Sequence, residues 1–362
     1  MNKNINFFTS IFLIFFSIFY FIYGFLIDEN IAGAGGYPGD FVHTWNNLQI
    51  YLNNNLLESV LSKEFFSNRS PLSYILQESL NPLIITKYNF RISIFFISLF
   101  IPVLLFYCLI IKYKKIDLLL GAVISSAVLF SPYVRTSGYW ALEENYGFVA
   151  LLLSYIFYNF YFFKKKYKLI YLSLLILCSS SCVYFDVKLT IVPLIIFFRI
   201  IKSNEDKFYK IVSVFMYFIA SIPYLILIYL WKGIFPPMAR PTHTLESGFY
   251  LDHIIFIVPI LALYIFPFLF AKDKNIFLET KNFFLSNYNL VILFGYFLFL
   301  IYIQFFYTPP EVSFHTTFGR GYIQKLSIFL FEDSLLKKIF IIISSFSSMV
   351  IIILYLKKNI FD

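Results

Sequence analysis

Charged residues are scarce in this chain of 362 residues: Asp, Glu, Lys and Arg together make up 14% of it, whereas 60% of the residues are hydrophobic. Soluble domains carry roughly a quarter charged residues, so this composition excludes a soluble globular protein. Cysteine is also rare, and Cys108, Cys178 and Cys182 lie in or beside apolar stretches without the paired spacing of a zinc site. We therefore expect no disulfide framework, no structural metal and no resident cofactor, and leave open a divalent cation in the reaction.

A basic domain and an internal repeat are missing as well. The net charge of +9 comes from short Lys/Arg clusters between apolar stretches. Such clusters are a topology signal of membrane proteins, and their distribution argues against nucleic acid as a partner. There is also no inverted pair of interrupted apolar stretches, the pattern that is typical of secondary transporters.

Long apolar stretches are what the chain does have. The hydrocarbon core of a bilayer is about 30 Å thick, and a helix that crosses it needs about 20 apolar residues. The first stretch follows a short basic start and lacks a small-residue cleavage site, so we expect an uncleaved membrane helix. The sixth is the shortest and leaves a count of eight or nine open. The sequence predicts an all-α polytopic membrane protein, with one transmembrane domain over 1–362 and about ten transmembrane helices at 7–27, 92–111, 116–134, 145–163, 169–185, 189–201, 211–231, 253–271, 290–307 and 339–356.

The basic clusters predict the orientation of these helices. Lysines concentrate in the short connections 112–115 and 164–168, which the positive-inside rule assigns to the cytoplasm. Both termini are then cytoplasmic. The abundance of Asn, Lys, Ile and Phe is typical of A/T-rich bacterial genes, so we expect a bacterial inner (cytoplasmic) membrane. Any chemistry should lie on the outer face, where the longer polar segments are expected at 28–91, 135–144, 232–252 and 308–338.

Asp40 is the first candidate for catalysis. It follows the Gly- and Pro-rich segment 33–39, which we expect to form a turn at the membrane surface, and an interfacial helix is expected over 46–66. A carboxylate held at the boundary between water and membrane can act as a general base. The alternative is a solvated aspartate that caps the next helix. We predict Asp40 as the base and its neighbours His43 and Trp45 as substrate contacts.

The paired acids Glu143 and Glu144 stand where a polar segment enters the next apolar stretch. Carboxylates at the membrane edge are costly unless they face water, a cation or a substrate, so we predict a second catalytic acid here. Alternatively, they stabilise the positive end of the following helix, whose dipole would lower their basicity. Nearby, Arg135 and Tyr139 are candidates for substrate contact, although Tyr139 also fits an ordinary aromatic belt.

Several basic residues occupy outer segments that are stiffened by proline or flanked by glycine. Guanidinium groups donate in pairs to phosphate oxygens, and a rigid loop loses little entropy on binding, so we predict a site for the phosphate of a lipid-linked donor. The alternative is a set of ordinary interfacial basic residues. Asp186 and Lys188, in a short turn, are expected to pair with neighbours. The predicted phosphate ligands are Arg69, Lys232, Arg240, His243 and Arg320.

Together these residues place acids and cations on one membrane face. That combination suits the transfer of a sugar from a lipid phosphate. Cations would hold the leaving phosphate, a carboxylate would remove the proton of the acceptor hydroxyl, and the sugar would pass through an oxocarbenium-like state.

The order of these motifs resembles the GT-C superfamily of integral-membrane glycosyltransferases. The resemblance covers roughly residues 1–270. It rests on Gly-Asp-Phe-Val-His around Asp40, on Arg-Ser-Pro-Leu-Ser-Tyr at 69–74, and on Ser-Pro at 131–132 followed by the acids at 143–144.

Two further motifs are similar in spacing to the dolichyl-phosphate-glucose alpha-1,2-glucosyltransferase branch and its bacterial relatives. They are Tyr-Phe-Asp-Val-Lys-Leu-Thr at 184–190 and Trp-Lys-Gly-Ile-Phe-Pro-Pro at 231–237, the latter followed by His243. The first loop departs from the superfamily pattern because it has a single acid rather than an adjacent pair. The chain also lacks a large C-terminal outer domain, which argues against a peptide acceptor.

The resemblance implies Asp40 as the base and Glu143 or Glu144 as the second acid. It also implies a polyprenyl-phosphate sugar as donor and a lipid-linked or cell-envelope glycan as acceptor. Two other classes stay open. A flippase for lipid-linked oligosaccharides or a polysaccharide polymerase would share the basic outer loops, and a non-catalytic scaffold would share only the apolar helices.

Overall fold

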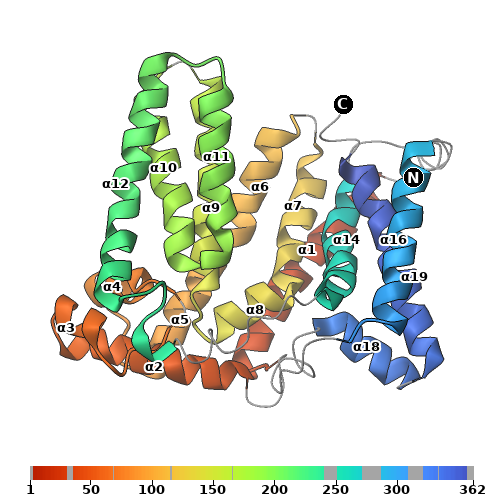
Figure 1. The fold of residues 1–362 in the computed structure, drawn as a ribbon, viewed down its shortest axis with the longest axis horizontal. Coiled ribbons are helices and arrows are strands. Elements are labelled where there is room, and N and C mark those ends of the chain that lie inside the picture. Colours follow the sequence, from red (N-terminus) through yellow and green to blue (C-terminus); the bar gives the residue numbers. More distant parts are fainter. Residues whose placement is uncertain are drawn as a thin grey trace. The chain divides into compact units, whose positions relative to one another are not determined.

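The computed structural model describes most of the chain as helices, and the regular structure of the described residues contains no strand. The helices form two compact units, residues 1–242 and 243–362, and Figure 1 shows their course. The all-α prediction is therefore confirmed for the part of the chain that the structure describes. The described residues are 3–30, 36–67, 69–114, 116–164, 166–239, 251–270, 287–308, 321–332 and 334–356.

The first unit contains long upright helices and several short ones. Its elements are α1 (Lys3–Leu26), α2 (Gly36–Asn53), α3 (Leu56–Leu61), α4 (Leu72–Leu80), α5 (Lys87–Ser98), α6 (Phe100–Lys112), α7 (Leu118–Ser126), η1 (Ala127–Phe130), α8 (Pro132–Tyr139), α9 (Glu144–Phe163), α10 (Lys168–Phe185), η2 (Val187–Thr190), α11 (Ile191–Lys202), α12 (Lys207–Trp231) and η3 (Pro237–Ala239).

The second unit is smaller and is built around its last helix. That helix, α19, packs against the other three, and the buried side chains of Ile255, Leu300 and Ile341 form the centre of the core. The elements of this unit are α14 (Asp252–Phe270), α16 (Asn287–Phe305), α18 (Gly321–Phe331) and α19 (Leu335–Leu356).

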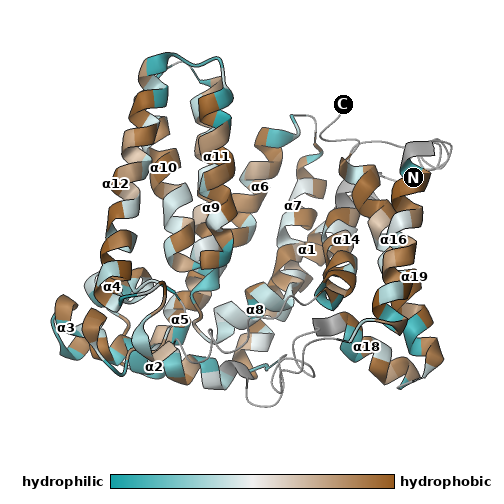
Figure 2. Cartoon of the chain, in the orientation of Figure 1, coloured by the Kyte–Doolittle hydropathy of each residue, from teal (hydrophilic) through white to brown (hydrophobic). Residues whose placement is uncertain are grey.

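Six helical segments among the described residues are long and apolar enough to cross a membrane, and the chain is therefore a polytopic membrane protein. The sides of these helices are largely apolar, whereas polar residues gather at the ends of the first unit (Figure 2). Large side chains such as Phe8, Ile211 and Tyr229 are 70%, 69% and 82% exposed, as expected for a lipid-facing surface. The six segments are Phe7–Leu26, Lys87–Lys112, Glu144–Phe163, Lys168–Phe185, Lys207–Trp231 and Leu335–Leu356.

The predicted count of ten transmembrane helices is not reached by the described residues. α11 has 12 residues, which is about 18 Å of helix at 1.5 Å per residue and falls short of the hydrocarbon core. α14 and α16 contain 19 residues each, and the parts searched for spans, Asp252–Phe266 and Asn289–Phe305, are shorter apolar helices. The described residues thus contain six candidate spans, or seven if α7, η1 and α8 count as one bent span.

A bend interrupts the stretch 116–134, which the sequence predicts as one span. η1 ends at Phe130, and Pro132 is the first residue of α8. Proline has no N–H group to donate, and the first helical turn is where that loss costs least. α8 consequently leaves the axis of α7 and η1 at an angle of 62°. The bend places the acids that follow α8 at the same end of the unit as α2, α3 and α4 (Figure 1).

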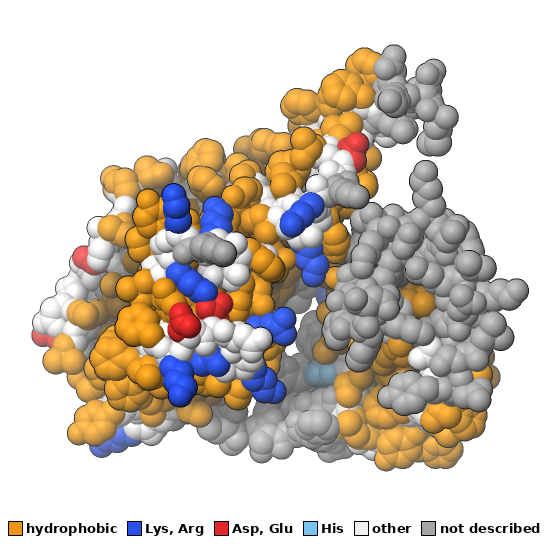
Figure 3. Space-filling model, turned by 90° about the horizontal axis from the view of Figure 1, so that it is seen from above, with side chains coloured by type: hydrophobic (Ala, Val, Ile, Leu, Met, Phe, Trp, Pro, Cys, Tyr) orange, Lys and Arg blue, Asp and Glu red, His pale blue; other side chains and the backbone are white. Residues whose placement is uncertain are grey.

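The two ends of the first unit differ in charge and construction. At one end lie the short connections α6–α7, α9–α10 and α11–α12 (Figure 1), and Lys and Arg side chains gather over them (Figure 3). The opposite end carries α2, α3, α4 and α8 (Figure 1). The described basic residues of the first end are Lys112, Lys114, Lys164, Lys166, Lys168, Lys202, Lys207 and Lys210.

Close packing joins α1 to α8. The ring of Phe21 lies 5.1 Å from that of Tyr139, which is fully buried. Gly24 allows the approach, because a Cβ atom there would lie 2.8 Å from Cε2 of Tyr139 and 2.7 Å from Oε2 of Glu29. No real Cβ atom tolerates two such contacts without a shift of its neighbours.

We expect Gly24→Ala to destabilise the protein by about 1–3 kcal/mol, because it forces an extra methyl group into a filled interface. Gly39→Ala is the matched control, since a Cβ atom at that position would meet nothing within 4 Å, and alanine gains up to about 1 kcal/mol over glycine within a helix. Thermal unfolding of the purified variants in detergent measures both effects. A Gly24→Ala variant that melts at the wild-type temperature would contradict this packing.

Candidate functional site

Asp40 lies on α2 rather than behind a turn. The sequence predicted a turn over 33–39 and a helix from 46, but α2 already begins at Gly36. Pro38 falls in its first turn, where a missing N–H group costs no hydrogen bond, so the Gly/Pro segment is compatible with a helix start. The predicted turn is therefore wrong for residues 36–39, while residues 33–35 lie outside the described part of the chain.

Asp40 and His43 share one face of α2, because they are three residues apart on a helix. Both side chains are exposed, and the ring of His43 lies 5.1 Å from that of Phe66. Partial burial raises the pKa of Asp40 above its ordinary value, and the negative charge of Glu144 raises it further, while His43 and Arg69 lower it. A carboxylate with a raised pKa is a better proton acceptor.

Glu143 and Glu144 meet Arg69 at the start of α9. Nη1 of Arg69 lies 3.7 Å from Oε2 of Glu143, and Nη2 forms an ion pair with Oε1 of Glu144. The hydroxyl of Ser137, on α8, donates a hydrogen bond of 3.2 Å to the other oxygen of Glu144. Both acids are buried, at 3% and 8% exposure. They are therefore ion-paired with a partly buried guanidinium, and they also lie at the positive end of α9.

A tight connection between α8 and α9 sets this arrangement. Ala141 adopts a positive φ of 50°, and the backbone N–H of Leu142 donates to the carbonyl of Ser137 over 3.0 Å. The turn brings the end of α8 back beside the start of α9. Ser137 and Glu144 are thereby placed side by side although seven residues separate them.

Burial raises the pKa of Glu143, while the charge of Arg69 and a hydrogen bond with Tyr74 lower it. Asn47 fixes this region to α2: its amide donates to the carbonyl of Phe66 over 2.7 Å and to the hydroxyl of Tyr74 over 3.2 Å. The same side chain accepts from the N–H of Phe66 over 3.1 Å. One asparagine on α2 thus holds both sides of the segment that carries Arg69.

Asp186 joins the same region from the turn between α10 and η2. It is 4% exposed and accepts a hydrogen bond of 3.3 Å from the hydroxyl of Tyr133. Its charge contributes to the raised pKa of Arg69. Asp40, Arg69, Glu143, Glu144 and Asp186 are called the acid cluster below.

A second ionic network lies at the end of α1. Arg135 pairs with Glu29, and its guanidinium carbon lies 4.2 Å from the ring centre of Tyr20. Arg91 pairs with Asp28 over 2.6 Å and lies 4.3 Å from the ring of Trp140. Both arginines, which are 5% and 8% exposed, thus fasten α1 to α5 and α8.

Two predicted substrate contacts, Arg135 and Tyr139, fall in this second network. Nε of Arg135 donates to the hydroxyl of Tyr139 over 3.2 Å, and the Tyr139 ring lies within the core. Sequence reasoning missed Arg91, although a guanidinium inside an apolar helix demands a partner and is a signal in itself. Trp45, the other predicted aromatic contact, packs 6.0 Å from the ring of Phe90.

The predicted phosphate ligands divide into two groups. Arg69 is already paired with carboxylates, and Lys232 is exposed at the end of α12 with a positive φ of 55°. Arg240, His243 and Arg320 lie outside the described residues. Within the described residues, no group of three or more His, Cys, Asp or Glu side chains is arranged to hold a metal ion.

No protein-family model, curated protein or solved structure matches this chain. The resemblance to the GT-C superfamily therefore stays an expectation drawn from the sequence motifs.

An apolar groove of about 400 Å³ lies next to the acid cluster. It runs between α3, the start of α4 and α12, and its lining includes Ser70, Tyr184 and Leu227. Ser70 follows Arg69 in the chain, and its hydroxyl donates to the carbonyl of Tyr184 over 2.7 Å. Ser70 stands one residue from Arg69 and Tyr184 two residues from Asp186, so the groove adjoins the cluster through these two segments.

The α12 wall of this groove contains Pro223 within a continuous helix. The hydroxyl of Tyr184 donates to the carbonyl of Ala220 over 2.6 Å and accepts from the N–H of Tyr224 over 3.2 Å. A side chain thus replaces one backbone hydrogen bond of the helix, which is a recognised cause of helix bending.

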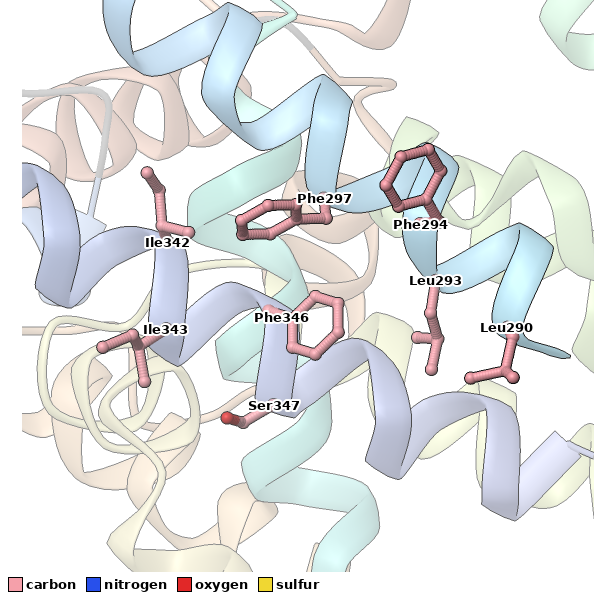
Figure 4. Close-up of a pocket in the computed structure, with 8 residues that line it drawn as sticks. All are labelled: Leu290, Leu293, Phe294, Phe297, Ile342, Ile343, Phe346 and Ser347. Atoms are coloured by element: carbon pink, nitrogen blue, oxygen red, sulfur yellow. The ribbon is translucent and has the colours of Figure 1, made fainter. Parts of the chain in front are cut away.

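The second unit has an apolar groove of its own, of about 410 Å³, between α16 and α19 (Figure 4). Phe297 and Phe346 lie on its facing walls, and Ser347 is the polar residue of the lining. The described residues that line it carry no charge, so this groove offers room for hydrocarbon but no group for acid–base chemistry.

Proposed function

We propose that this protein is a membrane glycosyltransferase. It transfers a sugar from a polyprenyl-phosphate donor to a lipid-linked or cell-envelope glycan on the outer face of a bacterial inner membrane. The single observation that carries the proposal is that the apolar groove adjoins the acid cluster through the segments of Ser70 and Tyr184. A lipid-linked sugar needs both, because its chain is apolar and its head is charged.

The chemistry follows from the positions of the acids. Asp40, exposed and with a raised pKa, accepts the proton of the acceptor hydroxyl as that oxygen attacks the anomeric carbon of the sugar. The bond from this carbon to the phosphate oxygen breaks, and its electron pair leaves with the polyprenyl phosphate. Glu143 or Glu144 stabilises the positive charge on the sugar in the oxocarbenium-like transition state. His43, next to Asp40 on α2, contacts the substrate.

Cations neutralise the leaving phosphate in this scheme. The Pro-rich segment after α12, with Lys232, Arg240 and His243, and the Gly-flanked Arg320 supply them on sequence grounds. Guanidinium donors that fork onto two phosphate oxygens would stabilise the charge that develops there.

The decisive experiment is incubation of the purified protein with a panel of polyprenyl-phosphate sugars and a glycan acceptor extract. Release of polyprenyl phosphate together with sugar transfer is the expected result. Transport of a lipid-linked sugar across vesicles, without release of polyprenyl phosphate from any donor, would favour the flippase alternative.

The proposal also fixes the topology, with both termini cytoplasmic and the acid cluster on the outer face. Single cysteines at two exposed sites at opposite ends of the first unit, Asn46→Cys on α2 and Asn204→Cys between α11 and α12, test it in a cysteine-free background. We expect a membrane-impermeant maleimide to label position 46 in intact cells and position 204 only after lysis. The reverse pattern would overturn the orientation.

A further inference from the structure

Lys188 is an exposed basic side chain at the edge of the acid cluster. Its Nζ lies 3.5 Å from the hydroxyl of Tyr133 and 5.8 Å from the centre of that ring. The Tyr133 hydroxyl donates to Asp186 over 3.3 Å, and Asp186 accepts the backbone N–H of Lys188 over 3.1 Å. The buried carboxylate thus fixes both the turn that carries the lysine and the phenol on which its ammonium group rests.

The arginines around the cluster already form ion pairs with carboxylates. Arg69 pairs with two glutamates, Arg91 with Asp28 and Arg135 with Glu29. A guanidinium that is paired with a carboxylate has its charge compensated and some of its donors occupied, so it is a weaker ligand for an incoming anion. The sequence suggested Arg69 as a phosphate ligand. Because Arg69 is ion-paired, we expect a different cation to bind the phosphate.

Lysines are the remaining candidates at this end of the first unit. Among the described residues, Lys188 forms no ion pair with a carboxylate and is in contact with the acid cluster. Lys63, Lys87 and Lys232 are exposed as well, but no interaction with the cluster is found for them. Lys188 can therefore bind an anion without the loss of an ion pair to a carboxylate.

The apolar groove lies within reach of Lys188. Tyr184, which lines the groove, is four residues earlier in the chain, and four residues span at most about 14 Å even when fully extended. A lipid whose hydrocarbon chain occupies the groove would therefore carry its phosphate to the neighbourhood of this ammonium group.

We propose that Lys188 binds the phosphate group of the lipid substrate and that Tyr133 positions it. The inference rests on the proposed function, since it assigns a ligand group to the same site. The ammonium group can donate up to three N–H groups to phosphate oxygens. Its contact with the Tyr133 phenol restricts the lysine side chain before binding, so less conformational entropy is lost when the phosphate binds.

Binding of undecaprenyl phosphate to the purified protein in nanodiscs, measured by native mass spectrometry, tests the inference. We expect Lys188→Ala to weaken this binding by about tenfold or more, as for loss of a charged hydrogen bond, and Lys188→Arg to restore most of it. Lys87→Ala, which removes another exposed lysine, should bind as the wild type does. Undecaprenol, which lacks the phosphate, should bind equally to all variants.

Three outcomes would overturn the inference: wild-type affinity in Lys188→Ala, an equal loss of undecaprenol binding, or no binding to the wild type. Inorganic phosphate should compete only weakly, and competition as strong as that of the lipid would assign the site to free phosphate instead. The readout is independent of transfer. If lipid phosphate binding depends on Lys188 but no sugar is transferred, the binding site stands and the proposed glycosyltransferase function is wrong. If Lys188→Ala transfers sugar with the wild-type KM, the proposed function stands and the role of Lys188 is wrong.

Discussion

Asp40→Asn is expected to fold and to bind lipid as the wild type does, while sugar transfer falls by about a hundred- to ten-thousand-fold, the range typical of general-base catalysis. The amide keeps the size of the carboxylate and most of its hydrogen bonding but cannot take a proton. The side chain is exposed on α2, so its replacement leaves no cavity. Release of polyprenyl phosphate from a labelled donor measures the loss.

Glu58→Gln is the matched control, because Glu58 is another exposed acid near the same end of the unit. It should retain full activity. If Asp40→Asn keeps more than about a tenth of wild-type turnover, less than the loss expected for a base, the base lies elsewhere and Glu144 is the next residue to replace.

The pH dependence of transfer reports on the same carboxylate. A general base works only when deprotonated, so activity falls as the pH falls through its pKa. Because burial and Glu144 raise the pKa of Asp40, the acid limb should lie above that of an ordinary aspartate. Glu144→Gln removes one of the two causes and should move this limb to lower pH in whatever activity remains. If the acid limb does not move, the charge of Glu144 does not influence the pKa of the general base.

Arg69→Met is expected to destabilise the protein by about 3–5 kcal/mol, because it strands two carboxylates in a buried site. Glu143 and Glu144 are 3% and 8% exposed, and both pair with this guanidinium. Thermal unfolding in detergent measures the loss. Lys63→Met, at an exposed lysine close in sequence, is the matched control and should unfold at the wild-type temperature.

The triple variant Arg69→Met, Glu143→Gln, Glu144→Gln separates charge from packing. Removing all three charges abolishes the unpaired anions, so most of the stability should return even though activity does not. An Arg69→Met variant as stable as the wild type would show that the two glutamates are not held by this arginine. A triple variant as unstable as Arg69→Met would point to lost packing instead.

The composition was enough to predict a helical membrane protein, because long apolar stretches have few other stable structures. It did not show that one of the predicted spans, 116–134, bends near its end. Pro132 stands inside an apolar stretch, and hydropathy registers that stretch as continuous although the backbone turns there by 62°. The start of α2 was misplaced for a similar reason, since Pro38 and its glycines fit a first helical turn as well as a loop.

The candidate acids were visible in the sequence, but their partners were not. Arg69 and Glu144 are separated by 75 positions, and Arg135 and Glu29 by 106. No spacing rule links such residues, because the fold alone brings them together. Arg69 was predicted to bind phosphate and Arg135 to contact the substrate, but both are ion-paired with glutamates. Lys188 was expected to pair with neighbours, and its side chain is exposed.

The ionic network at the end of α1 also sets an order of events during synthesis. Asp28 and Glu29 leave the ribosome before Arg91 and Arg135, so each guanidinium finds its carboxylate already made. Until the first helix docks, Arg91 and Arg135 lack the carboxylates with which they pair in the folded protein. A chain that is truncated from its N-terminus beyond residue 29 would lose both carboxylates at once. Arg91 and Arg135 would then be unpaired cations, and we expect such a chain to be degraded.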